Sequence, residues 1–332
     1  MTMIKIGLIG AGFMGNTHSE VYKILSTLQD VKLVAVADIR TEKAEEIAKY
    51  HGAKVYSTGE ELIADTDIDV VDICLPTFIH AKFAKMAMES GKNVFIEKPV
   101  TLTSEEGAAL LEVQEKTGAK VQVGQCIRLW SAYVYLKDLF DNNTYGRLKN
   151  LALRRLSPQA TWSWQDWYND ISLSGGAVMD LHIHDVDFAR YLLGNPTSMN
   201  IAGDRGQVFA LYNYPDNVTV QIEGGWDYPA CFPFGMYYKA NFENATVIYE
   251  ASTVTVYLHD DDHQFVVDVE PPETANLSGS LGGNLSELGG YFNELKYFYD
   301  CLLNDKENTI APLSEGVASL NLVLKEIEQG GF

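Results

Sequence analysis

The sequence predicts an α/β protein of two domains, in which a doubly wound parallel sheet is followed by an α+β domain with an open, mainly antiparallel sheet. Two observations predict this fold class. Short apolar runs alternate with helical segments up to about residue 125, and longer strands without intervening helices dominate the second half. The expected domains are therefore residues 1–125 and 126–332, a division that suits a chain of 332 residues.

The expected strands of the first domain are short apolar runs rich in β-branched residues, which suit a parallel sheet buried on both faces. They are Lys5–Ile9, Lys32–Ala37, Lys54–Tyr56, Val70–Leu75, Val94–Ile96 and Val121–Val123. Helices are expected at Thr41–Tyr50 and Ile79–Ser90, where apolar residues recur at helical spacing. A further helix is expected after Thr103, which opens a Thr-x-x-Glu capping box.

The pattern changes after Cys126. A helix at Ser131–Phe140, a strand at Arg147–Arg155 and a long helix beginning near Gly175 are expected first. Strands joined by short turns then predict the antiparallel sheet: Val208–Tyr212, Val218–Glu223, Met236–Phe242, Thr246–Tyr249, Thr253–Leu258 and Phe265–Val269. A loop at Pro271–Asn284 and helices at Tyr291–Leu303 and Ser314–Glu328 complete the expected elements.

Charge and composition exclude several kinds of partner. The net charge is −20, with 13 basic and 18 acidic residues up to Gln125 against 12 and 27 after it. Nucleic acid and anionic lipid repel such a chain, whereas a neutral polyol remains acceptable as a substrate. We find no signal-peptide pattern, no membrane-length apolar stretch and no C-x-x-C pair, so we expect a cytoplasmic protein with reduced thiols.

The first functional signal is the segment Gly10-Ala11-Gly12-Phe13-Met14-Gly15, a G-x-G-x-x-G between an expected strand and an expected helix. Gly10 allows the tight turn, Gly12 lets the backbone approach a pyrophosphate, and Gly15 lets helix and strand pack closely. The helix N-terminus supplies N–H groups and a positive dipole end for the phosphates. The first domain is therefore expected to be a Rossmann dinucleotide-binding domain.

The acid at the end of the second expected strand indicates which dinucleotide binds. Asp38 follows Gly15 by 23 residues, where a carboxylate accepts hydrogen bonds from the ribose 2′-hydroxyl and repels a 2′-phosphate. NAD is therefore expected rather than NADP. Arg40 keeps NADP open, because an arginine two residues further on can hold a 2′-phosphate.

The second signal is Glu97-Lys98-Pro99, at the carboxyl end of an expected central strand. Ligands of open α/β sheets bind outside that end of the strands. Pro99 cannot extend the sheet ladder and fixes the local turn, so Lys98 can point into the cleft. A solvated lysine at a strand end is the alternative. The Lys98–Pro99 bond is expected to be cis, because Lys98 must turn sharply off its strand.

The third signal is the segment Gly175–Asp187, with sequence GGAVMDLHIHDVD. On a helix, Asp180 and His184 are an i,i+4 pair on one face, where a carboxylate can orient an imidazole and raise its pKa. Such a pair suits acid–base chemistry. Solvated polar residues are the alternative, and a metal site is another. No metal is expected, because a second ligand cluster and the H-E-x-x-H spacing are both absent.

Aromatic residues crowd the loop before this segment: Trp162, Trp164, Trp167 and Tyr168. Aromatic rings pack well against the C–H faces of sugars, and they also dominate buried contacts. We expect at least two of the four to be structural, and we take Trp164 as the candidate for substrate contact.

Together these segments resemble the glucose–fructose oxidoreductase / inositol dehydrogenase / MocA (Gfo/Idh/MocA) family over essentially the whole chain. Glu97-Lys98-Pro99 followed by Gly-Gly-x-x-x-Asp-x-x-x-His-x-x-Asp from Gly175 is the specific part, and Pro76-x-x-x-His80 also looks like the family. The resemblance implies an NAD(P)-dependent dehydrogenase. It would transfer a hydride between the nicotinamide and a hydroxyl-bearing carbon of a sugar, inositol or related polyol. It also implies a homodimer or homotetramer.

The resemblance places catalytic roles on Lys98, Asp180 and His184. We assign the base to His184, substrate and imidazole orientation to Asp180, and stabilisation of the reacting oxygen to Lys98, with Lys98 as proton carrier left open. The substrate-binding candidates are Lys98, Arg128, Trp164, Asp180 and His184. The cofactor-binding candidates are Gly10, Gly12, Phe13, Met14, Gly15, Asp38, Arg40, Pro76, His80, Glu97 and Lys98.

Two other functions stay open at this point. One is a non-catalytic NAD-binding regulator on the same scaffold, against which the retained Lys98, Asp180 and His184 argue. The other is an enzyme that keeps NAD bound and uses it transiently, as in redox-assisted cleavage of glycosides. The substrate itself is not identified, since Gln125-Cys126 departs from the family's more usual residues near Arg128.

Overall fold

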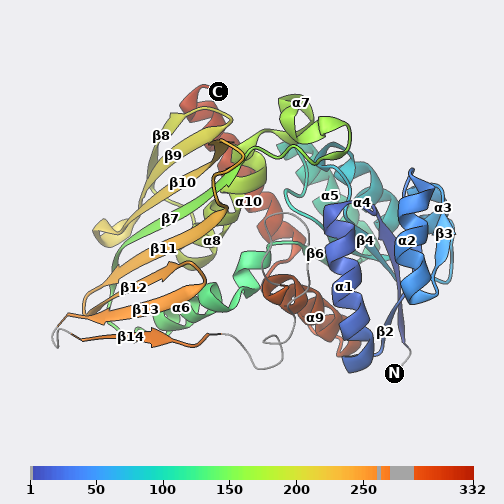
Figure 1. The fold of residues 1–332 in the computed structure, drawn as a ribbon, viewed down its shortest axis with the longest axis horizontal. Coiled ribbons are helices and arrows are strands. Elements are labelled where there is room, and N and C mark those ends of the chain that lie inside the picture. The colour runs from blue at the N-terminus through green and yellow to red at the C-terminus, as the bar shows by residue number, and fades with distance from the viewer. Residues whose placement is uncertain (1–2, 260–262, 270–287) are drawn as a thin grey trace. The chain divides into compact units, whose positions relative to one another are not determined.

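The computed structural model describes residues 3–259, 263–269 and 288–332, and these fall into two units (Figure 1). The first unit comprises Met1–Cys126 and Asn276–Val317, and the second comprises Ile127–Ala275 and Ala318–Phe332. The first break lies beside the boundary expected after residue 125. The later segment of the first unit falls within the range 126–332 that the sequence division assigned to one domain. The loop expected at Pro271–Asn284 lies outside the described residues.

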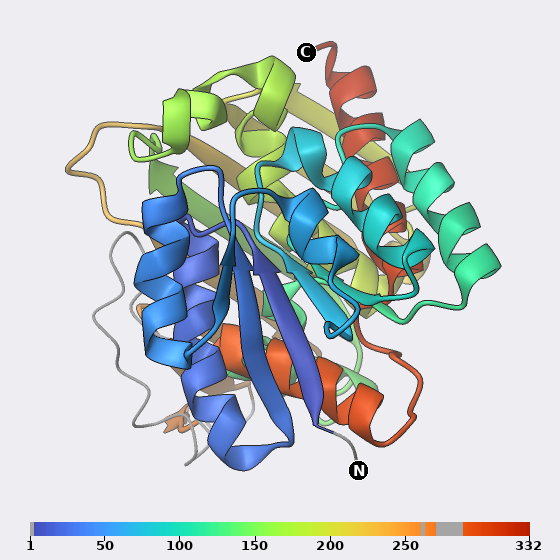
Figure 2. The same ribbon diagram turned by 90° about the vertical axis from the view of Figure 1, so that its right-hand side faces the viewer.

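A six-stranded parallel sheet forms the centre of the first unit (Figure 2). In chain order its strands are β1 (Ile4–Ile9), β2 (Val31–Ala37), β3 (Lys54–Tyr56), β4 (Val70–Ile73), β5 (Asn93–Ile96) and β6 (Val121–Val123). They lie side by side in the order β3-β2-β1-β4-β5-β6, which is the Rossmann order. The expected Rossmann domain is confirmed. The order reverses between β1 and β4, so ligands are expected at the carboxyl ends of these strands.

Helices cover both faces of this sheet. One face carries α1 (Phe13–Leu28), α2 (Thr41–His51) and α9 (Gly289–Leu303), whose apolar side chains share one core with β1, β2 and β4. Of the helices α3 (Gly59–Ala64), α4 (His80–Glu89) and α5 (Ser104–Thr117), α4 packs against both of the others and along β4 and β5. The 3-10 turns are η1 (Thr77–Ile79) and η2 (Cys126–Leu129), the latter crossing the unit boundary.

The N-terminus of α5 shows how local sequence sets an element boundary. The Thr103 hydroxyl accepts a hydrogen bond from the Glu106 N–H at 3.2 Å, as the capping box predicts. The Glu106 carboxylate accepts from the Leu102 N–H at 3.3 Å, one residue earlier than the capping box places it. Gly118, in the left-handed region at φ 71°, then ends the helix.

An eight-stranded sheet forms the second unit, in the order β14-β13-β12-β11-β7-β10-β9-β8. Its strands are β7 (Leu148–Pro158), β8 (Ser198–Gly203), β9 (Gln207–Asn213), β10 (Thr219–Tyr228), β11 (Gly235–Phe242), β12 (Ala245–Glu250), β13 (Thr253–Leu258) and β14 (Gln264–Val267). Among the described strands of this sheet, only β7 and β10 pair in parallel. The expectation of a mainly antiparallel sheet is confirmed, and β8 is an additional strand at its edge.

Helices lie against one face of this second sheet. They include α6 (Ser131–Asp141) and α8 (Ile183–Leu193), and Tyr133 of α6 packs edge-on against Tyr238 of β11 at 5.4 Å between ring centroids. Side chains alternate along β9, since Val208 and Ala210 are buried and Phe209 and Leu211 are exposed. The shorter elements are η3 (Trp164–Asn169), α7 (Ile171–Ser174), the π-helix η4 (Val178–His182) and η5 (Pro215–Asn217); α10 (Leu313–Gly330) runs from the first unit into the second.

No helix in the described part of the chain combines the length and the apolar character that crossing a bilayer requires.

Candidate active site

The glycines between β1 and α1 have different surroundings. Gly10 has φ +99°, and a Cβ there would lie 2.3 Å from the Cys74 carbonyl oxygen. A Cβ at Gly15 would lie 1.9 Å from the Gly10 carbonyl oxygen. At Gly12, the N-cap of α1, a Cβ would meet no described atom within 4 Å, and no side chain caps the helix. The chain's own packing therefore requires Gly10 and Gly15, whereas Gly12 faces open space at a helix N-terminus that suits a phosphate.

Asp38 lies at the end of β2 and holds this loop. Its carboxylate, 8% exposed as a residue, accepts hydrogen bonds from the backbone N–H of Ala11 at 2.7 Å and of Arg40 at 2.8 Å. The Arg40 guanidinium also donates to Asp38, with Nε at 3.2 Å. The acid and the base singled out in the sequence are thus paired with each other beside the glycine loop.

His80 connects the ends of two strands of the sheet. Its Nδ1 lies 2.9 Å from the Pro99 carbonyl oxygen and its Nε2 lies 2.7 Å from the Leu75 carbonyl oxygen. Burial lowers the pKa of His80, and a neutral ring can donate only one of these hydrogen bonds. Pro76 is the N-cap of the turn η1, which lies between Leu75 and His80 in the chain. This geometry favours a role in holding the cofactor edge of the sheet together rather than direct contact with a dinucleotide.

Lys98 follows β5 at the carboxyl edge of the parallel sheet. The Lys98–Pro99 bond is cis, which confirms the expectation. The Lys98 N–H donates to the Glu97 carboxylate at 3.1 Å, and the Glu97 N–H still pairs with Ile73 of β4. Glu97 itself is buried. The backbone from which Lys98 extends is therefore fixed by the neighbouring acid.

Below this edge is a buried polar group that we call the His18 cluster: His18, Asp72, Cys74, Glu97 and Glu294. Sequence analysis did not identify it as a unit. Two triads in it place ligand-type atoms within 4.8 Å of one another and can in principle hold a metal ion: His18/Asp72/Cys74 and His18/Glu97/Glu294. The expectation that the chain lacks a second cluster of potential ligands was wrong, because these residues come together only in the fold.

In the second unit, Asp180 and His184 lie on one helical segment, as expected. The segment begins as the π-helix Val178–His182 and continues as α8, after Gly175 and Gly176 at φ 78° and 80°. Asp180 is half-buried and His184 is 7% exposed. π-Helical turns are rare in proteins, and those that occur are often found at functional sites. That Lys98 meets these two residues in one cleft stays a prediction.

The other acids of this segment are buried rather than solvated. Asp187 accepts two hydrogen bonds from Arg128, at 2.8 Å and 2.7 Å, and the Arg128 guanidinium lies 4.5 Å from the centre of the Tyr191 ring. Asp185 pairs with Arg155 at 3.1 Å. Both carboxylates are fully buried. The charge of Arg128 is therefore used inside the second unit, which favours a structural role over contact with a substrate.

We expect Arg128→Met to lower the free energy of unfolding by about 3–5 kcal/mol, because it leaves the Asp187 carboxylate buried without its cation. Denaturant unfolding measures the change. Arg154→Met is the matched control, since the Arg154–Glu250 pair is exposed and should contribute less than about 1 kcal/mol. Unchanged stability with a raised KM for substrate would instead assign Arg128 to substrate binding.

The aromatic loop is anchored through Tyr168. Trp167 stacks on the Tyr168 ring at 4.1 Å, and Tyr168 packs edge-on against Trp226 of β10 at 5.9 Å. Trp162 is 50% exposed and Trp164 is half-buried at the start of η3. Trp167 and Tyr168 thus have structural contacts, as expected for at least two of the four, and Trp164 stays a candidate for substrate contact.

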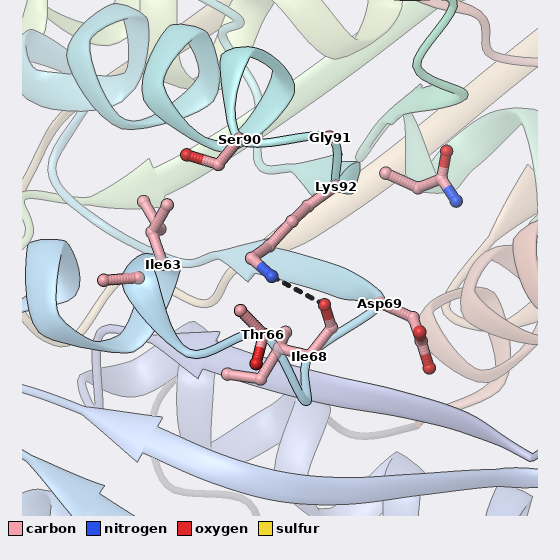
Figure 3. Close-up of a pocket in the computed structure, with 9 residues that line it drawn as sticks. Ile63, Thr66, Ile68, Asp69, Ser90, Gly91 and Lys92 are labelled. Atoms are coloured by element: carbon pink, nitrogen blue, oxygen red, sulfur yellow. Dashed lines mark hydrogen bonds between the residues drawn. The ribbon is translucent and has the colours of Figure 1, made fainter.

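A surface pocket of the first unit lies at the amino ends of the parallel strands, where β4 and β5 begin (Figure 3). Its central group is the Lys92 amine, which donates to the carbonyl oxygens of Ile68 at 2.7 Å and Asp65 at 2.8 Å. Burial lowers the pKa of Lys92. The pocket lies where β4 and β5 begin, whereas the glycine loop follows the end of β1, so the two lie at opposite ends of the parallel strands.

Comparison with known proteins identifies the family. The model of the oxidoreductase family with an NAD-binding Rossmann fold, GFO_IDH_MocA, matches residues 4–125. The model of the GFO/IDH/MocA C-terminal domain matches residues 133–248. The chain belongs to the Gfo/Idh/MocA family. The resemblance based on Glu97-Lys98-Pro99 and the segment from Gly175 is confirmed.

Similar Gfo/Idh/MocA proteins include inositol dehydrogenases. The chain is 36% identical to an inositol 2-dehydrogenase of Rhizobium meliloti over 191 residues, which is 58% of this chain and 55% of that protein. It is 34% identical to a scyllo-inositol 2-dehydrogenase (NAD(+)) of Bacillus subtilis over 195 residues, 58% of this chain and 54% of that protein. The matched region thus spans about half the length of these relatives.

Solved structures of similar fold extend the likeness to the whole chain. A levoglucosan dehydrogenase in complex with NADH and levoglucosan superposes with a TM-score of 0.87 at 21% identity, covering 99% of this chain and 97% of that one. A UDP-N-acetylglucosamine 3-dehydrogenase of Acidithiobacillus ferrooxidans superposes with a TM-score of 0.79 at 20% identity, covering 100% and 99%. At these identities the likeness establishes the Gfo/Idh/MocA fold alone.

Proposed function

We propose that this protein is an NAD-dependent oxidoreductase that transfers a hydride between NAD(H) and a hydroxyl-bearing carbon of a sugar, inositol or related polyol. The observation that carries the proposal is that the chain belongs to the Gfo/Idh/MocA family and keeps Lys98 after β5 and Asp180 and His184 on one helical segment. The names of its relatives, which include inositol dehydrogenases, support this substrate class.

The cofactor would lie along the carboxyl edge of the parallel sheet. The glycine loop from Gly10 to Gly15, including Phe13 and Met14, would hold the pyrophosphate at the N-terminus of α1, where Gly12 leaves open space. Asp38 would accept hydrogen bonds from the ribose hydroxyls. Bound NAD+ supplies the hydride acceptor, and the backbone at Glu97 and Lys98 would flank its nicotinamide end.

The protein's residues would carry the proton and the developing charge. With NAD+ as the hydride acceptor, His184 would take the proton of the reacting hydroxyl, and the alcohol would be oxidised to a carbonyl. Asp180 orients the substrate and the imidazole. The Lys98 amine hydrogen-bonds the reacting oxygen and stabilises negative charge on it. Transfer of the proton to Lys98 is the alternative within the same site.

An activity survey tests the proposal. Purified protein with NAD+ is offered single inositols, monosaccharides and anhydrosugars, and NADH formation is followed by absorbance. At least one compound should give turnover that depends on enzyme concentration. The absence of turnover with every compound, in either direction, would contradict the proposal and favour the NAD-binding regulator.

We expect NAD to stabilise the protein more than NADP at equal concentration, because the Asp38 carboxylate repels a 2′-phosphate. A ligand at 100 times its Kd adds about 2.7 kcal/mol to the free energy of unfolding, so a thermal melt detects it. Asp38→Ser is the informative variant, since it frees the Arg40 guanidinium from its pair and should shift the preference towards NADP. Stronger stabilisation of the wild type by NADP would contradict this expectation and indicate that Arg40 binds the 2′-phosphate.

We also propose a homodimer or homotetramer. The face of the second sheet opposite α6 and α8 carries side chains that are exposed among the described residues, including Phe209, Leu211 and Tyr257. Apolar groups gathered on one face are typical of surfaces that another chain covers.

A further inference from the structure

Glu294 is a buried acid on α9 that the proposed mechanism does not use. Its side chain is fully buried, and neither carboxylate oxygen has a hydrogen-bond partner among the described residues. One Glu294 oxygen lies within 4.8 Å of both a ring nitrogen of His18 and a Glu97 oxygen. An ionised carboxylate without a hydrogen-bond donor is strongly disfavoured in such surroundings. Glu294 must therefore be either protonated or paired with a cation.

His18 joins the two other acids of the cluster. Its Nδ1 lies 2.8 Å from Asp72 Oδ2, and its Nε2 lies 3.2 Å from Glu97 Oε1. The Tyr22 hydroxyl donates to the same Asp72 oxygen at 2.6 Å and lies 3.0 Å from the Tyr299 hydroxyl. Burial acts to lower the pKa of His18, but the Asp72 carboxylate and Cys74 raise it well above its ordinary value. The Nδ1 contact with Asp72 is a hydrogen bond, whereas Nε2 and the Glu97 oxygen are at ion-pair distance without hydrogen-bond geometry.

Glu97 links this buried group to Lys98. One carboxylate oxygen faces His18, and the other accepts the Lys98 N–H at 3.1 Å. Gly124 packs behind the carboxylate, since a Cβ there would lie 3.1 Å from its atoms. The Glu97 side chain is thus confined between the imidazole and the backbone of the residue that the proposed mechanism places at the reacting oxygen.

The charges around Glu294 indicate its protonation state. Burial raises the pKa of Glu294 well above its ordinary value, and the negative charge of Glu97 raises it further. His18 acts in the opposite direction, and the effects of Asp72, which raises the pKa, and of Lys98, which lowers it, are smaller. A protonated Glu294 has an O–H that can donate to the Glu97 carboxylate.

We propose that Glu294 and His18 are positioning residues for Lys98, which they hold through the Glu97 carboxylate that accepts the Lys98 N–H. The role of Lys98 at the reacting oxygen rests on the proposed function. The contacts of His18 on α1 and Glu294 on α9 with Glu97 are independent of the proposed function, because all of these residues belong to the first unit.

Two variants of Glu294 test the proposal. Glu294→Gln keeps a neutral donor of the same shape, whereas Glu294→Leu keeps the approximate volume and removes the donor. A misplacement of about 1 Å can lower a rate by about 10²-fold, so we expect Glu294→Leu to lower kcat by up to about that factor while the KM for NAD changes little. Glu294→Gln should retain most of kcat.

Amide exchange at Lys98 provides a readout that needs no turnover. In protein labelled with ¹⁵N-lysine, the Lys98 N–H should exchange slowly in the wild type and in Glu294→Gln, and faster in Glu294→Leu and His18→Leu. An inactive wild type with this exchange pattern would reject the proposed function and keep the positioning role.

Three results would overturn the positioning role. The first is equal Lys98 exchange in all variants, and the second is a loss of kcat in Glu294→Gln as large as in Glu294→Leu. The third is a stoichiometric divalent metal ion in the purified wild type that both variants lose, which would make the cluster a metal site. Glu294→Gln keeps the proposal testable if an apolar variant fails to fold, because it retains the size and the polar atoms of the Glu294 side chain.

Discussion

Replacing Lys98 or His184 by alanine should lower turnover by about 10²–10⁴-fold, the range typical of losing a positioned acid–base group. The affinity for NADH should stay close to that of the wild type, because the glycine loop and Asp38 are unchanged. Steady-state rates give the first quantity and NADH fluorescence titration gives the second. The double variant should lose much less than the product of the two single losses, since the residues would act as one unit.

Matched controls separate this effect from general damage. Lys82→Ala and His259→Ala remove an exposed lysine and an exposed histidine from the first and second units, respectively, and both should keep full turnover. Asp180→Asn should keep the shape of the site and weaken the polarisation of His184. Wild-type turnover in His184→Ala, or unfolding of that variant without a specific kinetic defect, would contradict the assignment of the base.

Alanine at Gly15 should lower the stability of the fold, whereas alanine at Gly12 should leave it unchanged. Gly15→Ala places a Cβ 1.9 Å from the Gly10 carbonyl oxygen, so α1 must move, and forced packing of this kind typically costs about 1–3 kcal/mol. Gly12→Ala meets no described atom within 4 Å and should fold normally. Both should lower NADH affinity by about tenfold or more, that is by about 1.4 kcal/mol or more.

Paired measurements on the two variants decide the role of the loop. Thermal melts without ligand should separate Gly15→Ala from Gly12→Ala, and fluorescence titration should show weak NADH binding in both. If Gly12→Ala binds NADH as tightly as the wild type, the pyrophosphate does not approach the backbone at Gly12, and the assignment of the glycine loop is wrong.

Local patterns in the sequence were sufficient for most of the first unit. All six strands of the parallel sheet are where short apolar runs predict them, with shifts of at most two residues at their ends. Asp38 does lie beside the glycine loop, because parallel strands bring their carboxyl ends to one edge. These features depend on short-range periodicity and on the regular geometry of a doubly wound sheet.

Features that depend on distant pairs could not be predicted in the same way. Glu294 lies 197 positions from Glu97, and the helical pattern of α9 gives no sign that one of its buried positions holds an acid. The partner of Arg128 could not be predicted either, since only the fold shows that it is Asp187. The parallel pairing of β7 with β10 and the π-helix before α8 also lack a sequence period that distinguishes them from an antiparallel pair and an α-helix.

Transfer of deuterium from substrate to cofactor tests the central proposal most directly. A polyol that turns over in the survey is prepared with deuterium on its reacting carbon, and the reduced cofactor is analysed by mass spectrometry. The proposed hydride transfer predicts one deuterium per molecule of NADH formed, with a carbonyl product. Unlabelled NADH, or a cleaved glycoside with no net NADH and the cofactor still bound after gel filtration, would contradict it.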